Sequence, residues 1–297
     1  MNAIISLAPF AEAAADDVEV DFERRFGGIS RLYGASALAR FRAAHVCVVG
    51  VGGVGSWIVE ALARSAIGEM TMIDLDNVAE SNINRQIQAL SDTLGKAKVT
   101  ALAERIAQIN PFCRVHQVED FITPDNLDQM IGGGRYDYVV DAIDNVRAKT
   151  ALIAYCRANG IKLITVGGAG GQTDPTRIEI RDLARTEQEP LLAKVRKRLR
   201  AEHGFPRGAK SRFGIEAVFS TEPLRFPEAG GACTADAKAG DSAGVTGLNC
   251  AGFGSAMVVT ASFGMAAAAR VLRDLAADAG SRIAGAATEA VACGSAA

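Results

Sequence analysis

A glycine-rich segment limits the possible fold more than any other feature of the sequence. Gly50, Gly52, Gly53 and Gly55 form the pattern GVGGVG, directly after the apolar run His45–Val49. Glycines at these positions allow a tight turn and let backbone N–H groups approach a phosphate at the positive N-terminus of a helix. We therefore predict a strand, a phosphate-binding turn and a helix, as in a nucleotide-binding βαβ unit.

The same alternation continues along the chain and predicts the fold class. Apolar runs typical of buried strands alternate with patterns typical of amphipathic helices. The expected strands are His45–Val49, Met70–Ile73, Val115–Val118, Tyr138–Ala142 and Lys162–Val166, and the expected helices are Ser30–Ala44, Val54–Ala66, Lys98–Asn110 and Ala148–Asn159. This order predicts an α/β, Rossmann-like fold, with a mainly parallel sheet and helices on both faces.

The regular alternation of expected strands and helices ends after Gly171, and we expect a C-terminal elaboration of the same domain. Further strands are expected over Arg177–Arg181 and Ile215–Ser220, with a charged helix over Glu189–His203 between them. We expect a flexible N-terminal extension over 1–22, a single domain over 23–276, a mobile loop over 227–247, and an irregular low-complexity tail over 277–297.

Composition excludes collagen-like and wholly disordered proteins. Hydrophobic types make up 49% of the chain, charged types 22%, and the net charge is −2, as in a globular chain with a buried core.

Residues 250–269 carry no charge and are long enough to span a membrane, but they are rich in Gly and Ala and lack an aromatic belt. We favour a buried helix there. The start of the chain lacks the features of a secretory signal, so we expect a cytoplasmic protein.

The six cysteines are scattered, and no CxxC pair occurs. This spacing argues against a zinc site made of paired cysteines and against a disulfide framework. Cys233, in the expected mobile loop, could be a thiol nucleophile or a sulfur-relay acceptor. We favour a non-essential role, because a lone cysteine without a nearby histidine is weak support for catalysis.

Polar and charged residues after the second expected strand suggest a triphosphate ligand. Asp74 lies nineteen residues beyond Gly55, where a carboxylate can accept hydrogen bonds from ribose hydroxyls. Arg85 and Lys98 could offset the charge of a triphosphate, although side chains of this kind usually lie on a solvated helix face. The other candidates in this stretch are Asp76, Asn82 and Asn84.

A third cluster follows the expected strand Tyr138–Ala142. Asp144 and Asn145 lie where the carboxyl ends of strands meet, which is the usual ligand-binding edge of an open α/β sheet. A carboxylate facing a triphosphate there could hold Mg2+. Either residue could also cap the following helix, and the two roles can coexist.

The glycine-rich loop and the segments DLD, SNINRQ, GKAK and DAIDN, in this order, resemble the E1-like adenylating family that includes ThiF, MoeB and HesA. The resemblance covers about residues 24–183 and implies an ATP-dependent enzyme that activates a carboxylate as an acyl-adenylate. It implies that Asp74 holds the ribose, that Arg85 and Lys98 hold phosphates, and that Asp144 holds Mg2+. It further implies a homodimer in which an N-terminal arginine, Arg25 or Arg31, reaches the partner's triphosphate, although Gly28 stands where the family usually has this arginine.

The later text, including DFITPDN, GGAGGQTDPTRIEI, VFSTE and GFGSAMVVTASFG, is similar to the branch of this family that modifies tRNA. This resemblance extends over roughly residues 24–275. It implies ATP-dependent cyclisation of N6-threonylcarbamoyladenosine beside the anticodon, with tRNA as the macromolecular partner.

A basic segment over residues 191–212 fits a tRNA partner. It holds eight basic residues and one acidic residue, while the whole chain is weakly acidic. The eight are Lys194, Arg196, Lys197, Arg198, Arg200, Arg207, Lys210 and Arg212. Clustered positive charge is typical of phosphate-backbone binding, and we favour that function over the common alternative, a solvated helix face.

Other functions stay open from the sequence. One is an adenylating enzyme for a ubiquitin-like sulfur-carrier protein. Another is a non-catalytic ATP-binding scaffold that works with a cysteine desulfurase or sulfur-acceptor proteins. A NAD-dependent dehydrogenase is the weakest alternative, because it leaves Asp76, Arg85 and Asp144 without a task.

Overall fold

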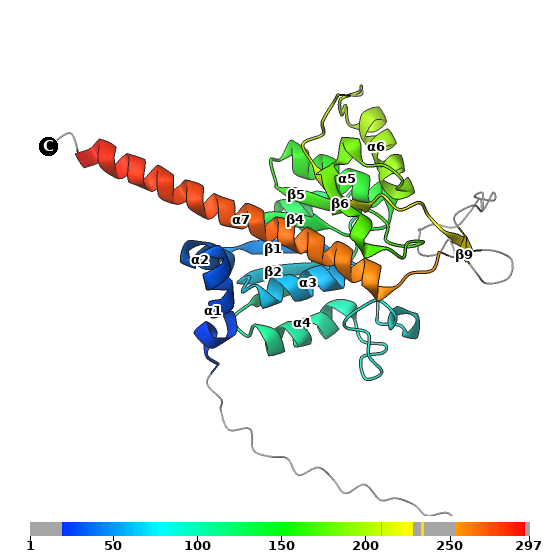
Figure 1. Cartoon of the computed structure of the whole chain (residues 1–297), viewed down its shortest axis with the longest axis horizontal. Coiled ribbons are helices and arrows are strands. Elements are labelled where there is room, and N and C mark those ends of the chain that lie inside the picture. Colours follow the sequence, from blue (N-terminus) through cyan, green and yellow to red (C-terminus); the bar gives the residue numbers. More distant parts are fainter. Residues whose placement is uncertain (1–19, 209, 228–232, 235–252, 295–297) are drawn as a thin grey trace, which may run out of the picture.

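A seven-stranded sheet forms the centre of the molecule in the computed structural model, which describes residues 20–208, 210–227, 233–234 and 253–294 (Figure 1). The strand order is β3-β2-β1-β4-β5-β7-β6. The strands are β1 His45–Val49, β2 Glu69–Ile73, β3 Arg114–Val118, β4 Tyr138–Asp141, β5 Leu163–Val166, β6 Ile178–Asp182 and β7 Glu216–Ser220. Within this sheet only the edge strand β6 pairs antiparallel, so the predicted fold class is confirmed.

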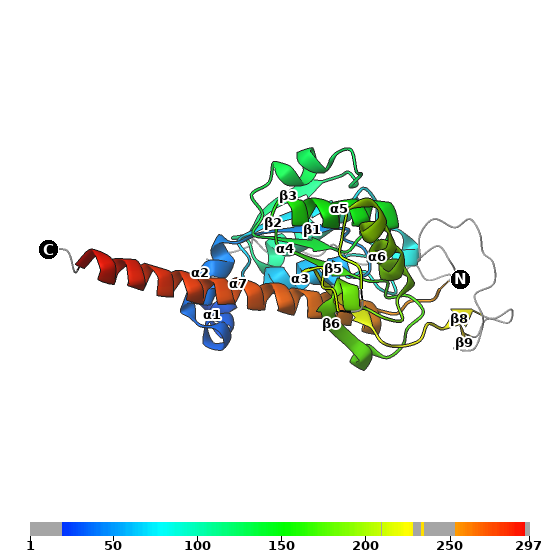
Figure 2. The same ribbon diagram turned by 90° about the horizontal axis from the view of Figure 1, so that it is seen from above.

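Helices cover both faces of this sheet (Figures 1 and 2). They are α1 Phe22–Tyr33, α2 Ala35–Ala43, α3 Gly55–Arg64, α4 Lys98–Ile109, α5 Val146–Ala158, α6 Pro190–Glu202 and α7 Met257–Gly294. Strand side chains alternate between two cores. Val46 and Val48 of β1 pack with α2, α3, α4 and α7, whereas Cys47 and Val49 pack with α5 and α6. Strands buried on both faces explain the continuous apolar runs in the sequence.

The predicted helix Ser30–Ala44 is wrong in one respect, because the chain forms two helices here. Gly34 separates α1 from α2 with a φ of 92°, a conformation that favours glycine. Its backbone N–H still makes a helical hydrogen bond to the Ser30 carbonyl oxygen at 2.8 Å, and its own non-helical conformation ends α1. The periodic apolar pattern continues across the break, which is why periodicity alone predicts one helix.

The uncharged segment 250–269 enters the core from Met257 onward as the first part of α7. Val259, Phe263 and Ala267 are fully buried against the sheet and its neighbouring helices. At Gly264 a Cβ atom would lie 2.8 Å from both Trp57 Cβ and the Val54 carbonyl oxygen, so glycine lets α7 approach α3 closely. Among the described residues, no helix is both long and apolar enough to span a membrane.

The C-terminal region differs from the expected irregular tail. Helix α7 continues through Ala277 as far as Gly294 and projects beyond the body of the molecule (Figures 1 and 2). Alanine has the highest helix propensity, so the composition that suggested low complexity also favours a helix.

Two expected flexible segments lie mostly outside the described residues. For the N-terminal extension, only the residues from 20 onward are described. In the expected mobile loop, a two-stranded ladder pairs β8 Phe226–Pro227 with β9 Cys233–Thr234. The remainder of that loop lies outside the described residues.

Candidate active site

A cavity of about 830 Å3 opens at the carboxyl ends of the central parallel strands. It lies where the chain order reverses on either side of β1, the usual ligand site of doubly wound sheets. Ten of the predicted residues line it: Gly50, Gly52, Gly53, Asp74, Asp76, Asn82, Arg85, Lys98, Asp144 and Asn145. The fold therefore brings together residues that lie up to 95 positions apart in the sequence.

The glycines of the loop serve two different purposes. A Cβ atom at Gly50 would lie 2.9 Å from the Ala142 carbonyl oxygen, and one at Gly55 only 1.8 Å from the Gly50 carbonyl oxygen. Gly55 is the first residue of α3 and is not part of the cavity lining. At Gly52 and Gly53, by contrast, only the side chains of Gln86 and Arg85 come near. The outer glycines shape the turn, and the inner two keep its surface open.

Asp74 fixes the conformation of this turn. Its Oδ2 accepts a hydrogen bond from the Val51 N–H at 2.7 Å, and its Oδ1 accepts one from the Asp76 N–H at 2.9 Å. Its side chain remains 11% exposed at the cavity. Asp74 thus joins the end of β2 to the glycine loop and still offers lone pairs to a ligand.

Lys98 begins α4 and points its ammonium group at two carboxylates. Its Nζ lies 2.7 Å from Asp76 Oδ2 and 3.9 Å from Asp74 Oδ1. The Lys98 side chain is 7% exposed, while that of Asp76 is 73% exposed. The ammonium group is therefore held at the cavity by an exposed partner.

Arg85 is supported through its backbone by two helices. Its carbonyl oxygen accepts hydrogen bonds from Trp57 Nε1 at 2.9 Å and from Thr260 Oγ1 at 3.5 Å. Its Nη1 donates to the Ser81 carbonyl oxygen at 2.7 Å and to Asn84 Oδ1 at 3.0 Å. The guanidinium group lies beside Gly53 at the cavity wall.

The two asparagines of this segment have structural partners. Asn82 Oδ1 accepts a hydrogen bond from the Ala79 N–H at 3.0 Å. Asn84 Nδ2 donates to the Ser255 carbonyl oxygen at 2.8 Å, and Asn84 does not line the cavity. Both residues thus hold the loop that carries Arg85.

The residues that follow β4 have separate roles. Asn145 caps α5, because its Oδ1 accepts hydrogen bonds from the Arg147 and Ala148 N–H groups. Asp144 is exposed at the cavity. Asp141 is fully buried, and its Oδ2 lies 2.8 Å from Lys149 Nζ and accepts a hydrogen bond from Thr165 Oγ1.

Sequence reasoning missed this buried Asp141–Lys149 pair and also Glu189. Glu189 caps α6 by accepting hydrogen bonds from the Leu191 and Leu192 N–H groups, and it also accepts one from the Gly168 N–H at 3.0 Å. Burial raises the pKa of Glu189 and outweighs the opposing effect of these bonds. A glutamate immediately before a Pro-initiated helix is the sequence signal that could have identified this cap.

The charges in the cavity lining do not favour a bare polyanion. Five carboxylates face three cationic side chains. The acidic residues are Asp74, Asp76, Asp120, Asp125 and Asp144, and the basic residues are Arg85, Lys98 and Arg147. A triphosphate in this cavity requires additional positive charge.

The eight residues of the basic segment divide into two groups. Arg196 bonds to Thr186 Oγ1, Arg198 pairs with Glu202 at 2.9 Å, and the Arg200 guanidinium lies 5.0 Å from the centre of the Phe213 ring. The other five are exposed: Lys194, Lys197, Arg207, Lys210 and Arg212. Since Leu191 lines the cavity, the basic helix α6 begins at the cavity and leads away from it.

The remaining candidates do not line the cavity of their own chain. Arg25 Nη1 donates to the Gln108 and Ile109 carbonyl oxygens at the end of α4, whereas Lys98 at the start of α4 lines the cavity. Arg31 is exposed in the last turn of α1. Cys233 forms a backbone ladder with Pro227.

Comparisons with known proteins agree with this architecture. The chain is 54% identical over 256 residues to a Haemophilus influenzae protein named tRNA threonylcarbamoyladenosine dehydratase, covering 86% of this chain and 94% of the relative. Two structures of the Escherichia coli tRNA N6-threonylcarbamoyladenosine dehydratase superpose on it with TM-scores of 0.77 and 0.76, at 51% and 52% identity. The first is a complex with ATP and the second a complex with AMP, and both cover 87% of this chain and 96% of the compared chain. The ThiF family profile matches residues 26–290, so the chain belongs to the ThiF family.

Proposed function

We propose that the protein catalyses the ATP-dependent dehydration of N6-threonylcarbamoyladenosine in tRNA, which closes this nucleoside to its cyclic form. Similarity over nearly the whole length of relatives with this activity in their name supports the proposal. The cavity that joins ten predicted nucleotide-binding residues at the carboxyl ends of the strands is the structural observation that carries it.

The chemistry explains why ATP is required. A carboxylate is a poor electrophile, because its leaving group would be oxide. In the proposed first step the threonyl carboxylate oxygen attacks the α-phosphorus of ATP and pyrophosphate leaves. The carbamoyl group then attacks the acyl carbon and loses a proton, and AMP leaves as the ring closes. Proximity of the two groups within one nucleoside can lower the barrier by about 7–11 kcal/mol.

We assign the nucleotide-binding roles to the residues of the cavity. Backbone N–H groups beside Gly52 and Gly53 would contact phosphates, and Asp74 would accept hydrogen bonds from the ribose. Arg85 suits forked contacts with phosphate oxygens, and Lys98 supplies a point charge. The exposed Asp76 can release the Lys98 ammonium group when a phosphate competes for it.

Mg2+ fits the donor set of this cavity. Asp141 is unsuitable as a ligand, because its carboxylate is buried against Lys149 and Thr165. Asp144 is exposed at the cavity and would hold the ion together with phosphate oxygens. Bound Mg2+ would neutralise phosphate charge. The lining alone cannot do so, because its five carboxylates outnumber its three cationic side chains.

The same shortage of positive charge supports a homodimer in which a partner's arginine completes the site. Arg25 and Arg31 both lie outside the cavity of their own chain and are the candidates for this role. The exposed basic side chains of the segment 191–212 would bind the tRNA backbone, with α6 guiding it to the cavity. We further propose that the reaction takes place in the cytoplasm, where both ATP and tRNA are available. No sulfur is transferred, so neither Cys233 nor a sulfur-donating partner is required.

Mass spectrometry of tRNA nucleosides tests the proposal. We expect incubation with ATP and Mg2+ to convert N6-threonylcarbamoyladenosine to a product lighter by one water, with AMP formed in equal amount. Asp144→Ala should abolish conversion, while Asp92→Asn, which removes an exposed carboxylate outside the cavity, should not.

The opposite outcomes identify the alternatives. Pyrophosphate exchange that depends on a small protein ending in Gly-Gly, and not on tRNA, would indicate a sulfur-carrier adenylating enzyme. ATP binding without any AMP formation would indicate a scaffold.

A further inference from the structure

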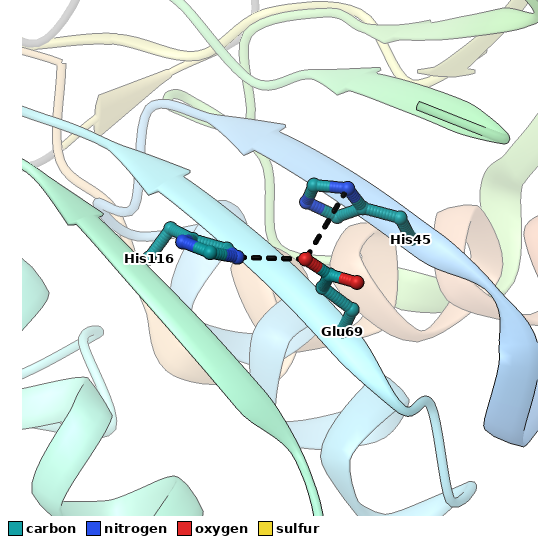
Figure 3. Close-up of side chains that lie close together, drawn as sticks. All are labelled: His45, Glu69 and His116. Carbon is teal, nitrogen blue, oxygen red and sulfur yellow. Dashed lines mark hydrogen bonds and ion pairs between the residues drawn. The ribbon is translucent and has the colours of Figure 1, made fainter. Parts of the chain in front are cut away.

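A second group of side chains that could bind a ligand lies toward the opposite end of the strands from the cavity. His45 begins β1, Glu69 begins β2, and His116 lies within β3, so three adjacent strands each contribute one side chain (Figure 3). In the parallel ladders His45 pairs with Glu69, and Glu69 pairs with Arg114, two residues before His116. The register therefore sets all three side chains close together.

The distances are close to those of a metal site. Glu69 Oε1 lies 2.7 Å from His116 Nε2 and 3.8 Å from His45 Nδ1, and the three potential ligand atoms all lie within 4.8 Å of one another. Ligand atoms around a tetrahedral zinc ion, with bonds of about 2.0–2.2 Å, are roughly 3.4 Å apart. Small side-chain rotations would bring the three atoms to one ion.

The surroundings of His45 orient it for such a role. Its Nε2 is 2.8 Å from Thr71 Oγ1, and its ring packs edge-on against Tyr136 with the ring centres 4.7 Å apart. A hydrogen bond from the second ring nitrogen is the usual support of a metal-binding histidine. Here Thr71 Oγ1 lies within hydrogen-bonding distance of Nε2, which leaves Nδ1 directed toward Glu69 (Figure 3).

The other two side chains can accommodate an ion as well. Arg114 Nη1 contacts Glu69 at Oε2, at 3.2 Å, so Oε1 remains the oxygen that faces both histidines. The side chains of His45, Glu69 and His116 are 17%, 26% and 44% exposed. The group is thus held by the sheet yet reachable from solvent, which leaves room for water as a further ligand.

We propose that His45, Glu69 and His116 form a binding site for a late first-row transition metal ion, in particular Zn2+. Two imidazoles and one carboxylate suit Zn2+, whereas Mg2+ prefers oxygen ligands alone. The site is distinct from the ATP cavity, because the five residues of β1 separate His45 from Gly50 by about 16 Å. An ion bound to three strands would stabilise the folded chain, since the ligands come together only in the folded state.

Titration of the full-length, untagged protein with Co2+ and then Zn2+ tests this site. The chain has three histidines, and the third, His203, is exposed at the end of α6 and provides a matched control. We expect wild type and His203→Gln to bind one Co2+ with the same visible absorption, to exchange it for Zn2+, and to gain thermal stability. Millimolar Mg2+ should not displace the ion.

The ligand variants should behave differently. His116→Gln and Glu69→Gln should each weaken Zn2+ binding by more than about tenfold and lose the metal-dependent rise in Tm. Their metal-free Tm values, compared with that of wild type, show whether each variant folds. Equal Zn2+ affinity in wild type and in a folded ligand variant, or no binding by wild type, would overturn the proposal.

Discussion

At the scale of single residues, the glycine loop shows that residues of one type can be required for different reasons. Gly55 is needed because the Gly50 carbonyl oxygen occupies the space of a side chain, whereas the nearest atom to a Cβ at Gly52 is 3.8 Å away. A side chain at Gly55 would therefore disturb folding, whereas a side chain at Gly52 would affect only a ligand that enters the cavity.

A pair of alanine variants separates these constraints. We expect Gly55→Ala to lower the free energy of unfolding by more than about 3 kcal/mol or to prevent folding, because backbone must move. Gly52→Ala should change it by less than about 1 kcal/mol but weaken ATP binding. Urea denaturation and ATP titration provide the two measurements. Equal destabilisation by both variants would contradict this division.

The sequence predicts which residues gather in the cavity but not which of them have protein partners. Spacing after strands and the glycine pattern are local signals, and ten of the candidates line one cavity. That Asn84 bonds to Ser255, or that Asp141 is buried against Lys149, depends on side-chain packing between distant segments. His45, Glu69 and His116 were missed for the same reason, because only the strand register brings them together.

At the scale of elements, Glu60 clamps α3 to α4. Its Oε2 accepts a hydrogen bond from Arg105 Nε at 2.6 Å, and its Oε1 accepts one from Arg64 Nε at 2.7 Å. Glu60 itself is only 5% exposed. Burial alone would raise the pKa of Glu60, but the hydrogen bonds and charges of the two arginines lower it below its ordinary value.

This clamp predicts a pH dependence of stability. Because the folded-state pKa is lowered, the stabilisation is complete above the ordinary Glu pKa of 4.5 and is lost as the pH falls through the lower folded value. We expect Glu60→Gln to cost about 2 kcal/mol at pH 7 and much less at low pH. Urea denaturation of both proteins from pH 7 to pH 3 measures the difference. A difference that does not shrink on acidification would show that the clamp is not electrostatic.

Element boundaries were harder to predict than element types. Apolar periodicity identifies the strands and most helices of the sheet, because both faces of each strand are buried. It does not register the break at Gly34, which depends on one backbone angle. It also gives no reason to extend α7 to Gly294, where alanine propensity rather than an apolar stripe continues the helix.

At the scale of the whole molecule, charge is segregated on a chain of net charge −2. Carboxylates outnumber cationic side chains in the cavity, while exposed basic side chains continue from α6 beyond Arg207. A polyanion as large as tRNA is thus expected to be attracted by the basic segment and not by the molecule as a whole.

Salt dependence provides the test of this attraction. We expect Lys194→Glu with Lys197→Glu to weaken tRNA binding and to reduce the slope of log affinity against log salt by about one to two. The pair Arg24→Glu with Arg135→Glu changes the net charge equally at exposed positions outside the basic segment and is the control. Equal effects of the two pairs in filter binding would mean that net charge, and not this surface, attracts tRNA.

The hydrogen bond from Trp57 to the Arg85 carbonyl has a practical consequence. Trp57 is the only tryptophan in the chain, so the intrinsic fluorescence at long wavelength comes from a single indole. That indole donates a hydrogen bond to the peptide that carries Arg85, and Gly264 of α7 lies close to the Trp57 Cβ. A shift of the Arg85 backbone on nucleotide binding would therefore change the environment of the one tryptophan, and we expect its fluorescence to report occupancy of the cavity without a label.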